Sequence, residues 1–420
     1  MSALRYWVWL SERHGLRSET VETLLEHFED PRGVYFAAES ELISLSLRPE
    51  ELETLRDKSL EKAQNILRRC TELDVQIVTR QDAIYPNRLK NIPDPPLLLY
   101  VSGRLPAIDE YAAIAIVGTR GASPYGIKMG MRMGYELTKG GALILSGLAE
   151  GVDSAGAEGA LRAGGSCVGV LGTAIDRVYP SFNRRLFEDV HAVGALISEY
   201  PPGAPMQRGS FPRRNRILSG LSVGVVVIEA PEKSGALITA ADALEQGRDL
   251  FAVPGNADSP NCVGSNALLR DCAKAVTGGS DVLCEYMHLF SGVSVPDERT
   301  LAMPPEREGR FSVPAAETAE AKPETLPEKQ EDYYKLRQPN PARAAQNEAS
   351  QALKSRLEQC SETQLKLIAA MTEAETHIDD IINASGVPAQ QALAEMTMLE
   401  LDGLVSQHAG KRFSLNIRRG

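Results

Sequence analysis

The segment Ile116-Val117-Gly118-Thr119-Arg120-Gly121-Ala122-Ser123-Pro124-Tyr125-Gly126 decides the fold class of this chain. It starts as an apolar strand, turns at a glycine and enters a helix, with Ser123 as the expected N-cap and Pro124 as the first helical residue. Glycine lets a ligand approach the backbone, and a helix N-terminus attracts anions. The segment predicts either a phosphate-binding loop assisted by Arg120 or an ordinary tight turn with a solvated arginine.

The same strand–loop–helix rhythm continues over residues 76–295. Apolar runs without polar alternation are typical of strands that are covered on both faces. Such runs occur at residues 114–117, 142–145, 167–171, 195–197, 224–228, 250–253 and 273–276. Their alternation with helical segments predicts an α/β fold, an extended Rossmann-like doubly wound parallel sheet. The loops that follow the strands should then meet in one crevice.

The two flanks differ from this central region in composition. Residues 1–75 predict a small helical domain, of helix-hairpin-helix or sterile-alpha-motif type, that either contacts DNA or a partner or only packs. Residues 296–350 are rich in Pro, Glu, Ala and Gln and predict a flexible linker. Residues 351–420 predict a winged-helix domain, because three amphipathic helices precede a basic hairpin.

Bulk properties exclude several classes of protein. Of the 420 residues, 43% are hydrophobic, which excludes a disordered chain. The net charge of −11 argues against a surface that is basic throughout, but it permits a local basic groove. No apolar run reaches about 18 residues, so no membrane segment is expected. The N-terminus lacks signal-peptide features, and the six cysteines are scattered, so we expect a cytoplasmic protein with reduced thiols and no metal or cofactor.

Several segments carry the polar groups that a polyanion would contact. Asp153, after the second strand, is expected to cap a helix more than to catalyse, and Phe187 either stacks on a base or lies in the core. The run Phe211-Pro212-Arg213-Arg214-Asn215-Arg216 is either a polyanion site or an exposed helix start. The candidate contacts are Gly118, Thr119, Arg120, Ser123, Tyr125, Ser146, Gly147, Asn183, Arg184, Phe187, Arg213, Arg214, Asn215, Arg216, Lys233, Ser234 and Gly235.

Common enzyme motifs are missing from the sequence. It has no G-x-G-x-x-G for a dinucleotide, no G-x-x-x-x-G-K-[ST] for ATP hydrolysis and no G-x-S-x-G nucleophile elbow. We therefore expect no catalytic residue.

Taken in order, seven motifs resemble the DNA-processing protein A family (DprA, also called Smf) over about residues 80–285. They are Val117-Gly118-Thr119-Arg120, Ser146-Gly147-Leu148-Ala149, Leu171-Gly172-Thr173, Ser198-Glu199-Tyr200-Pro201, the arginine run at 211–216, Ser234-Gly235-Ala236-Leu237-Ile238-Thr239 and Ala252-Val253-Pro254-Gly255.

The resemblance implies an extended Rossmann fold that binds and protects single-stranded DNA without sequence preference. It further implies loading of RecA recombinase during natural transformation, dimerisation through the core domain and no catalytic turnover. Carried over, the strand-binding residues would be Gly118, Thr119 and Arg120, with Arg184 and Phe187. The sequence departs from the family where a His is common, here Ala157, and where Gly-Leu is common, here Ala174-Ile175.

Two other functions are possible for a chain of this architecture. Rossmann-type nucleotide N-glycosidases of the lysine-decarboxylase-like kind use a Pro-Gly-Gly-x-Gly-Thr loop and a Glu, whereas this chain has Lys233-Ser234-Gly235-Ala236 and Glu229. A winged helix could instead bind duplex DNA as a regulator. Its presumed recognition helix, residues 389–401, carries Glu395 and Glu400 and no Lys or Arg, which favours a protein-contact or structural role.

Overall fold

The computed structural model describes residues 3–297, 300, 361–371, 376–401, 405–408 and 412–415. The expected linker at 296–350 therefore lies almost entirely outside the described residues. The described residues up to 300 belong to one compact unit, and those from 361 onward belong to a second. Each unit is considered by itself.

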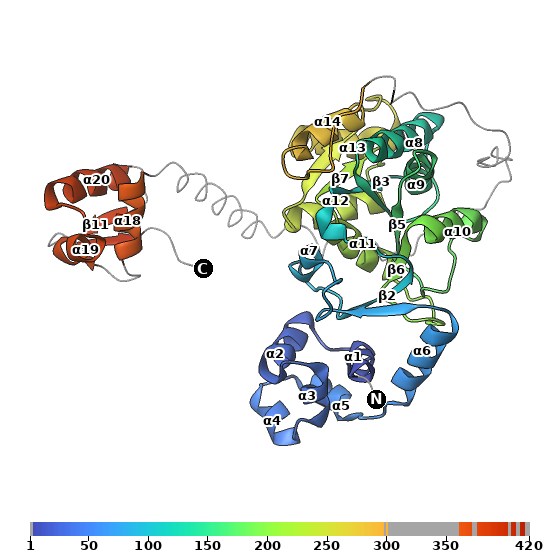
Figure 1. Ribbon diagram of the computed structural model, residues 1–420, viewed down its shortest axis with the longest axis horizontal. Helices are drawn as coiled ribbons and strands as arrows, with labels where there is room; N and C mark the ends of the chain where they lie inside the picture. Colours follow the sequence, from blue (N-terminus) through green and yellow to red (C-terminus); the bar gives the residue numbers. More distant parts are fainter. Residues whose placement is uncertain are drawn as a thin grey trace. The chain divides into compact units, whose positions relative to one another are not determined.

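A nine-stranded sheet forms the centre of the first unit (Figure 1). Its order is β1-β2-β6-β5-β4-β3-β7-β8-β9. The seven strands β6, β5, β4, β3, β7, β8 and β9 run parallel to one another. At one edge, β2 pairs antiparallel with β6, and β1 pairs antiparallel with β2. The strands are β1 (Gln76–Thr79), β2 (Leu98–Gly103), β3 (Ala113–Val117), β4 (Leu143–Ser146), β5 (Cys167–Leu171), β6 (Ala195–Ser198), β7 (Gly224–Val227), β8 (Asp249–Ala252) and β9 (Lys274–Ala275).

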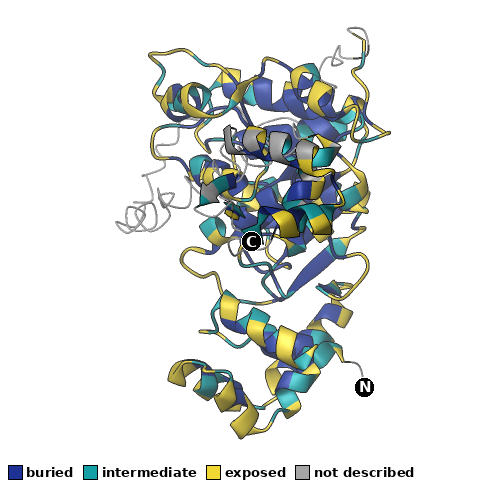
Figure 2. Cartoon of the chain, turned by 90° about the vertical axis from the view of Figure 1, so that its left-hand side faces the viewer, coloured by how far each residue is buried: buried dark blue, intermediate teal, exposed yellow. Residues whose placement is uncertain are grey.

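The fold class is confirmed, and all seven expected strands form. Alternate strand residues supply two separate apolar cores, Ile114 and Ile116 one of them and Ala113 and Ala115 the other. One core also contains side chains of α8 (Pro124–Lys139), α9 (Val152–Arg162), α10 (Arg184–Val193) and α14 (Gly279–Tyr286). The other contains side chains of α7 (Asn87–Lys90), α11 (Ser210–Leu221) and α12 (Gly235–Glu245), with α13 (Val263–Asp271) packed against it. Figure 2 shows the sheet as a buried layer.

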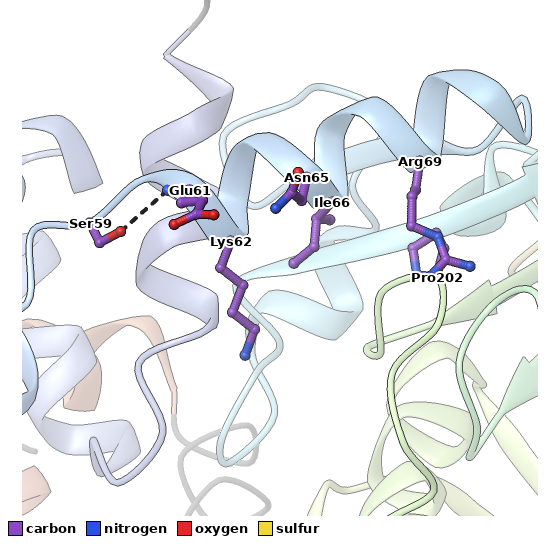
Figure 3. A pocket seen from close by; sticks show the side chains of 7 residues that line it. All are labelled: Ser59, Glu61, Lys62, Asn65, Ile66, Arg69 and Pro202. Atoms are coloured by element: carbon purple, nitrogen blue, oxygen red, sulfur yellow. Dashed lines mark hydrogen bonds between the residues drawn. The ribbon is translucent and has the colours of Figure 1, made fainter.

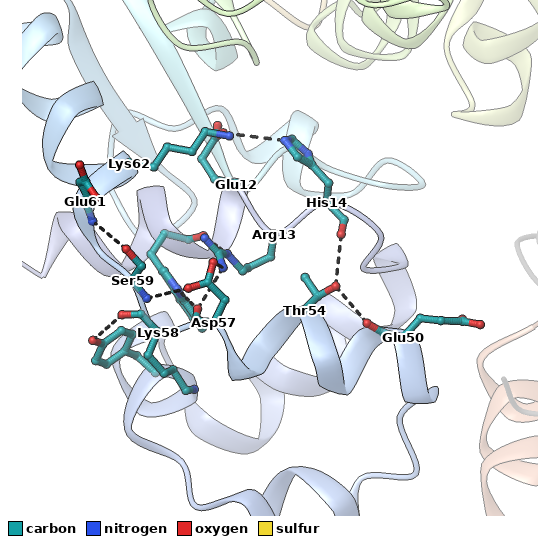
Figure 4. A network of polar contacts seen from close by, with 12 residues as sticks. Glu12, Arg13, His14, Glu50, Thr54, Asp57, Lys58, Ser59, Glu61 and Lys62 are labelled. Atoms are coloured by element: carbon teal, nitrogen blue, oxygen red, sulfur yellow. Dashed lines mark hydrogen bonds and ion pairs between the residues drawn. The ribbon is translucent and has the colours of Figure 1, made fainter.

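The N-terminal helices extend the first of these cores. They are α1 (Leu4–Ser11), α2 (Ser18–Phe28), α3 (Pro31–Phe36), α4 (Glu39–Ser44), α5 (Pro49–Arg56) and α6 (Glu61–Glu72). Trp7 and Trp9 of α1 lie in the same apolar cluster as Tyr100 of β2. Two salt bridges of 2.6 Å, Arg13 to Asp57 and Lys62 to Glu12, hold the loop before α6 and the first turn of α6 beside the residues that follow α1 (Figure 4). Helices and sheet thus share one core, and the domain boundary at residue 75 stays a prediction.

The second unit has the predicted winged-helix architecture. Its helices are α18 (Glu362–Ala370), α19 (Ile378–Ser385) and α20 (Ala389–Leu401), and its sheet has the order β10-β12-β11. The strands are β10 (Thr376–His377), β11 (Val405–His408) and β12 (Arg412–Leu415). Ile381, Met396 and Phe413 are buried in a core of its own. Across the described residues, no helix combines the length and apolar character that a bilayer span requires.

Candidate nucleic-acid interface

The sheet changes direction of winding between β3 and β7. From β3 the chain moves outward to β4, and β7 starts the other half of the sheet. In such sheets, ligands bind outside the carboxyl ends of the strands at this point. Here the position is occupied by Glu229, which follows β7 and is only 1% exposed. Its carboxylate accepts hydrogen bonds from Ser123 N (2.9 Å) and Ser123 Oγ (2.5 Å) at the start of α8.

The loop after β3 therefore uses its polar backbone groups internally. Thr119 N donates to the carbonyl oxygen of Glu229 (2.7 Å), and the Gly118 backbone donates to the carboxylate of Asp153. Ser123 also caps α8 by accepting from Gly126 N (3.2 Å). The expectation that these amides and the helix N-terminus hold an external phosphate is corrected, because a protein carboxylate already holds that place. The side chain of Arg120, in the same loop, is exposed to solvent.

Two buried charged groups, Asp153 and Arg214, connect the crevice loops. Arg214 Nη1 donates to the carbonyl oxygens of Gly147 (2.9 Å) and Val170, after β4 and within β5. Burial raises the pKa of Asp153, and the positive charges of Arg214 and Arg120 oppose that rise. Asp153 lies inside α9, one position beyond its first residue, and accepts backbone hydrogen bonds from two loops. Both groups hold the loops together.

Ser146 and Asn183 also stabilise loops. Ser146 Oγ donates to Asp153 O (2.8 Å) and accepts from Leu148 N (3.1 Å). Asn183 Nδ2 donates to Leu148 O (3.1 Å) and Ser154 Oγ (2.8 Å). The backbone of Leu148 has φ +51°, and these bonds fix that left-handed turn. They also bring the start of α10, with the exposed Arg184, next to the loop after β4.

The arginine run at the start of α11 divides into inward and outward members. Arg216 is 2% exposed and pairs with Glu199 (2.6 Å) and Asp94 (3.2 Å). Arg213 is exposed and also pairs with Glu199 (3.2 Å). The expectation of a polyanion site made by all three arginines is wrong for Arg214 and Arg216, since their guanidinium groups are buried against partners within the protein.

Phe187 requires a second correction. Its side chain is 3% exposed and belongs to the core beneath α10, so it cannot stack on a base. Phe182, five residues earlier, is 60% exposed beside Asn183 and was not among the candidates. A lone aromatic residue in a loop has no periodicity that separates a surface position from a core position, which is why the sequence did not reveal the difference.

Around the start of α12, Lys233 and Gly235 are exposed, and Ser234 caps the helix by accepting from Ala236 N (3.3 Å). Asn215 is buried and donates to Gly235 O (3.3 Å), so it joins α11 to α12. The exposed Tyr125 donates its hydroxyl to Pro254 O (3.0 Å), after β8.

One small pocket, about 40 Å³ in volume, lies where the crevice loops converge. Two of its lining residues, Arg120 and Gly147, are among the predicted DNA contacts, and the others are not. Its lining residues are Arg120, Gly147, Ala149, Glu150, Tyr179, Pro180 and Phe211. The pocket therefore combines one exposed cation, one exposed acid and two aromatic rings.

A larger pocket of about 390 Å³ lies along α6, against Pro202 (Figure 3). Its two cations already have partners, since Lys62 pairs with Glu12 and Arg69 pairs with Asp176 (3.1 Å). It contains none of the candidate contact residues. Among the described residues, no group of three or more His, Cys, Asp and Glu side chains is arranged to hold a metal ion.

Comparison with known proteins supports the resemblance seen in the motifs. The family model for DNA recombination-mediator protein A matches residues 76–287, and the model for the DprA winged helix domain matches residues 340–411. The Smf protein of Synechocystis sp. is 32% identical over 97% of this chain and 98% of its own length.

Two solved structures are also similar. DNA processing protein A (DprA) of Streptococcus pneumoniae is 32% identical, with a TM-score of 0.60, over 68% of this chain and 99% of that one. The structure of DNA processing protein A of Helicobacter pylori, which describes a single-stranded DNA binding mode, is 29% identical with a TM-score of 0.47, over 51% and 97% of the two chains. The chain belongs to the DNA recombination-mediator protein A family, whose members include the proteins named DprA and Smf.

Proposed function

We propose that the chain binds single-stranded DNA without sequence preference along the crevice at the carboxyl ends of the strands. The observation that carries this proposal is the exposed Arg120, whose guanidinium has no hydrogen bond or close ion pair within residues 3–297. Arg184 and Lys233 add exposed positive charge on neighbouring loops. Side chains of this kind contact phosphates, and phosphate contacts carry no sequence information.

We infer a preference for a single strand from one exposed ring, that of Phe182. Unpaired bases present their faces to aromatic side chains, and Phe182 offers an exposed ring next to Arg184. Bases inside a duplex are stacked on one another and cannot use such a ring. The proposed contacts are therefore phosphates on Arg120, Arg184, Arg213 and Lys233, with bases directed toward Phe182.

Family membership extends the proposal to a cellular role. We infer that the protein processes incoming DNA in natural transformation, protects the single strand and loads RecA recombinase onto it in the cytoplasm. We further infer a homodimer formed through the Rossmann-like domain. A non-catalytic role is supported by two buried acids of the crevice. Glu229 and Asp153 are both buried and hydrogen-bonded within the protein, so neither is presented to a substrate.

Neither alternative function gains support from the geometry. A nucleotide N-glycosidase would need Glu229 to reach a substrate, but its carboxylate lies beneath Ser123. For a duplex-DNA regulator, the described part of α20 offers no cationic side chain.

The direct test is anisotropy of labelled 40-nucleotide single strands and matched duplexes, titrated with the full-length protein at several salt concentrations. Tight, salt-dependent binding to unrelated single strands, well above duplex binding, is the expected result. Equal or stronger duplex binding would overturn the single-strand assignment. RecA filament nucleation on the same strands, with and without the protein, tests the loading role. Unchanged nucleation would refute it.

A further inference from the structure

Arg120 is stacked on an aromatic residue. Its Cζ atom lies 5.4 Å from the centroid of the Phe211 ring, and the Tyr179 ring lies 5.3 Å from the same centroid at an angle of 43°. The three side chains come from the loop after β3, the start of α11 and the loop after β5, and all line the small pocket. A stacked guanidinium uses its flat face, so its N–H edge stays available for a bidentate contact with an anion.

Phe211 is also packed closely against Gly172. A Cβ atom on Gly172 would lie 2.7 Å from Phe211 Cδ1 and 3.2 Å from Phe211 Cα, so the ring is packed against glycine backbone. Phe211 also sits in the first turn of α11, three residues before the buried Arg214 that bonds to two loop carbonyls. The ring is therefore well packed, and the exposed Arg120 guanidinium lies over it.

The size of the pocket selects its ligand. A buried water needs about 10–15 Å³ of this kind of volume. A pocket of about 40 Å³ has room for about three waters, which is enough for a small anionic group and too little to enclose a nucleobase. Because the pocket cannot enclose a base, we expect its aromatic rings to contact the Arg120 guanidinium instead.

Arg120 is the exposed cation among the residues that line the pocket. The buried Asp153 and Arg214 interact electrostatically with each other and with Arg120. A phosphodiester group would pair with the Arg120 guanidinium. The negative charge of the exposed Glu150, which lines the same pocket, would weaken that contact at any one nucleotide.

We propose that Phe211 is a positioning residue: in the pocket that it lines with Arg120 and Tyr179, its ring orders the Arg120 guanidinium for the phosphodiester contact. Phe211 does not stack on DNA bases. This inference rests on the proposed single-strand binding and adds to it a division of work between two aromatic residues: Phe211 serves the phosphate contact, and Phe182 serves the bases.

The test compares two ligands of equal length and charge, a 24-nucleotide oligothymidylate and the same backbone with abasic tetrahydrofuran units. Affinities are measured for the full chain and for Phe211→Leu, Phe182→Leu, Arg120→Ala and the Arg120→Ala/Phe211→Leu double variant. We expect Phe211→Leu to weaken binding about twofold to tenfold on both ligands, because it removes the cation–π surface. Phe182→Leu should weaken binding about fivefold or more on oligothymidylate and have no effect on abasic DNA.

Three further results belong to the expected pattern. The double variant should bind no more weakly than Arg120→Ala alone, because Phe211 acts through that arginine. Phe211→Tyr, which keeps the ring, should restore binding to within about twofold of the original chain. Gly172→Ala, which displaces the ring from the opposite side, should reproduce the loss seen in Phe211→Leu. Thermal unfolding of each variant shows whether the fold is intact, and the Phe211→Tyr and Gly172→Ala results decide the case if Phe211→Leu unfolds.

Contrary outcomes are distinct. If the Phe211→Leu loss disappears on abasic DNA, the ring contacts bases and the inference is wrong. If the double variant is additive, Phe211 does not act through Arg120. If the unmodified chain binds neither ligand, the proposed function itself fails along with this role of Phe211.

Discussion

Arg120, in the loop after β3, and Arg214, in α11, both lie at one crevice, yet their guanidinium groups lie in opposite environments. Arg120 is exposed over a ring, whereas Arg214 is buried and donates to carbonyl oxygens of the loop after β4 and of β5. Arg216 likewise lies inside, against Glu199 and Asp94. The acids and carbonyl groups that lie next to each arginine in the folded chain cause this difference. We therefore expect Arg120 to be available to a ligand, and Arg214 and Arg216 to stabilise the fold.

Arg120→Ala and Arg216→Ala should therefore fail in different ways. Arg120→Ala should lower single-strand affinity severalfold and reduce the slope of log K against log salt by about 0.7, the value for one phosphate contact. Its free energy of unfolding should stay within about 0.5 kcal/mol of the original. Urea unfolding and salt-titrated anisotropy measure the two quantities. Arg270→Ala, at an exposed position on α13, is the matched control for loss of a surface charge.

Arg216→Ala should instead lower the free energy of unfolding by about 1–3 kcal/mol, because Glu199 loses a charged hydrogen-bond partner. Any fall in its DNA affinity should follow the unfolded fraction. A folded Arg216→Ala protein with a reduced salt slope would show that this arginine contacts DNA after all.

Glu150→Gln should strengthen single-strand binding about twofold at low salt, since it removes a negative charge from the small pocket that Arg120 lines. The gain should shrink as salt rises because exposed charges are screened. Anisotropy at 50 and 300 mM salt tests this, with Glu232→Gln, an exposed acid outside that pocket, as the control. Weaker binding by Glu150→Gln would mean that the acid supports the site.

At the scale of elements, one buried carboxylate joins the starts of two N-terminal helices. Glu51 accepts hydrogen bonds from Arg17 Nε (3.0 Å) and N (3.2 Å) at α2, and from Arg48 N (3.0 Å) at α5. Burial acts to raise the pKa of Glu51, but the hydrogen bonds from Arg17, Thr20 and the backbone outweigh it and lower the pKa to about 2. The folded state thus prefers the ionised carboxylate.

The pH dependence of stability follows from that shift. The pKa of Glu51 is depressed in the folded chain, so its contribution is complete above the unfolded value of about 4.5 and is lost as pH falls toward 2. Glu51→Gln should lower the free energy of unfolding by about 1–3 kcal/mol at pH 7, and the gap to the original chain should narrow between pH 5 and pH 3. Urea unfolding at these pH values measures it. A gap that is constant with pH would exclude ionisation as its cause. Glu53→Gln, on the exposed side of α5, is the control.

The strands illustrate how far sequence reasoning reaches. Seven of them were predicted because a strand covered on both faces must be apolar throughout, and that requirement is visible in a single sequence. The strands β1 and β2 were not among the predicted seven. In β1 only two apolar residues stand between Gln76 and Thr79, which is too short a run to indicate a strand. The antiparallel pairing of β2 with β6 depends on contacts between residues far apart along the chain.

At the scale of the site, the sequence located the crevice loops and Arg120 but not the direction of each side chain. Phe187 and Phe182 have the same chemistry, and only the packing of α10 buries one and exposes the other. The role of Glu229 was equally hidden, because a carboxylate after a strand gives no sign that it will fold onto a helix N-terminus. Charge and residue type are local properties, whereas burial belongs to the assembled fold.

The whole molecule consists of two compact units with separate cores. Because the proposed contacts all lie in the first unit, deletion of residues 350–420 should leave single-strand affinity within about threefold of the full chain. The same anisotropy titration on both proteins tests this. Loss of most of the affinity on deletion would move the main DNA site to the winged helix and would remove the basis for the crevice proposal.

The carboxylate of Glu229 has a further consequence for the choice of ligand. Rossmann-like sheets commonly seat the phosphates of nucleotides at a helix N-terminus. In this protein that seat is filled from within by Glu229. Under the proposed function, a single phosphate would therefore gain little at the start of α8, whereas a strand would gain from each phosphate that it places on Arg120 and the neighbouring loops.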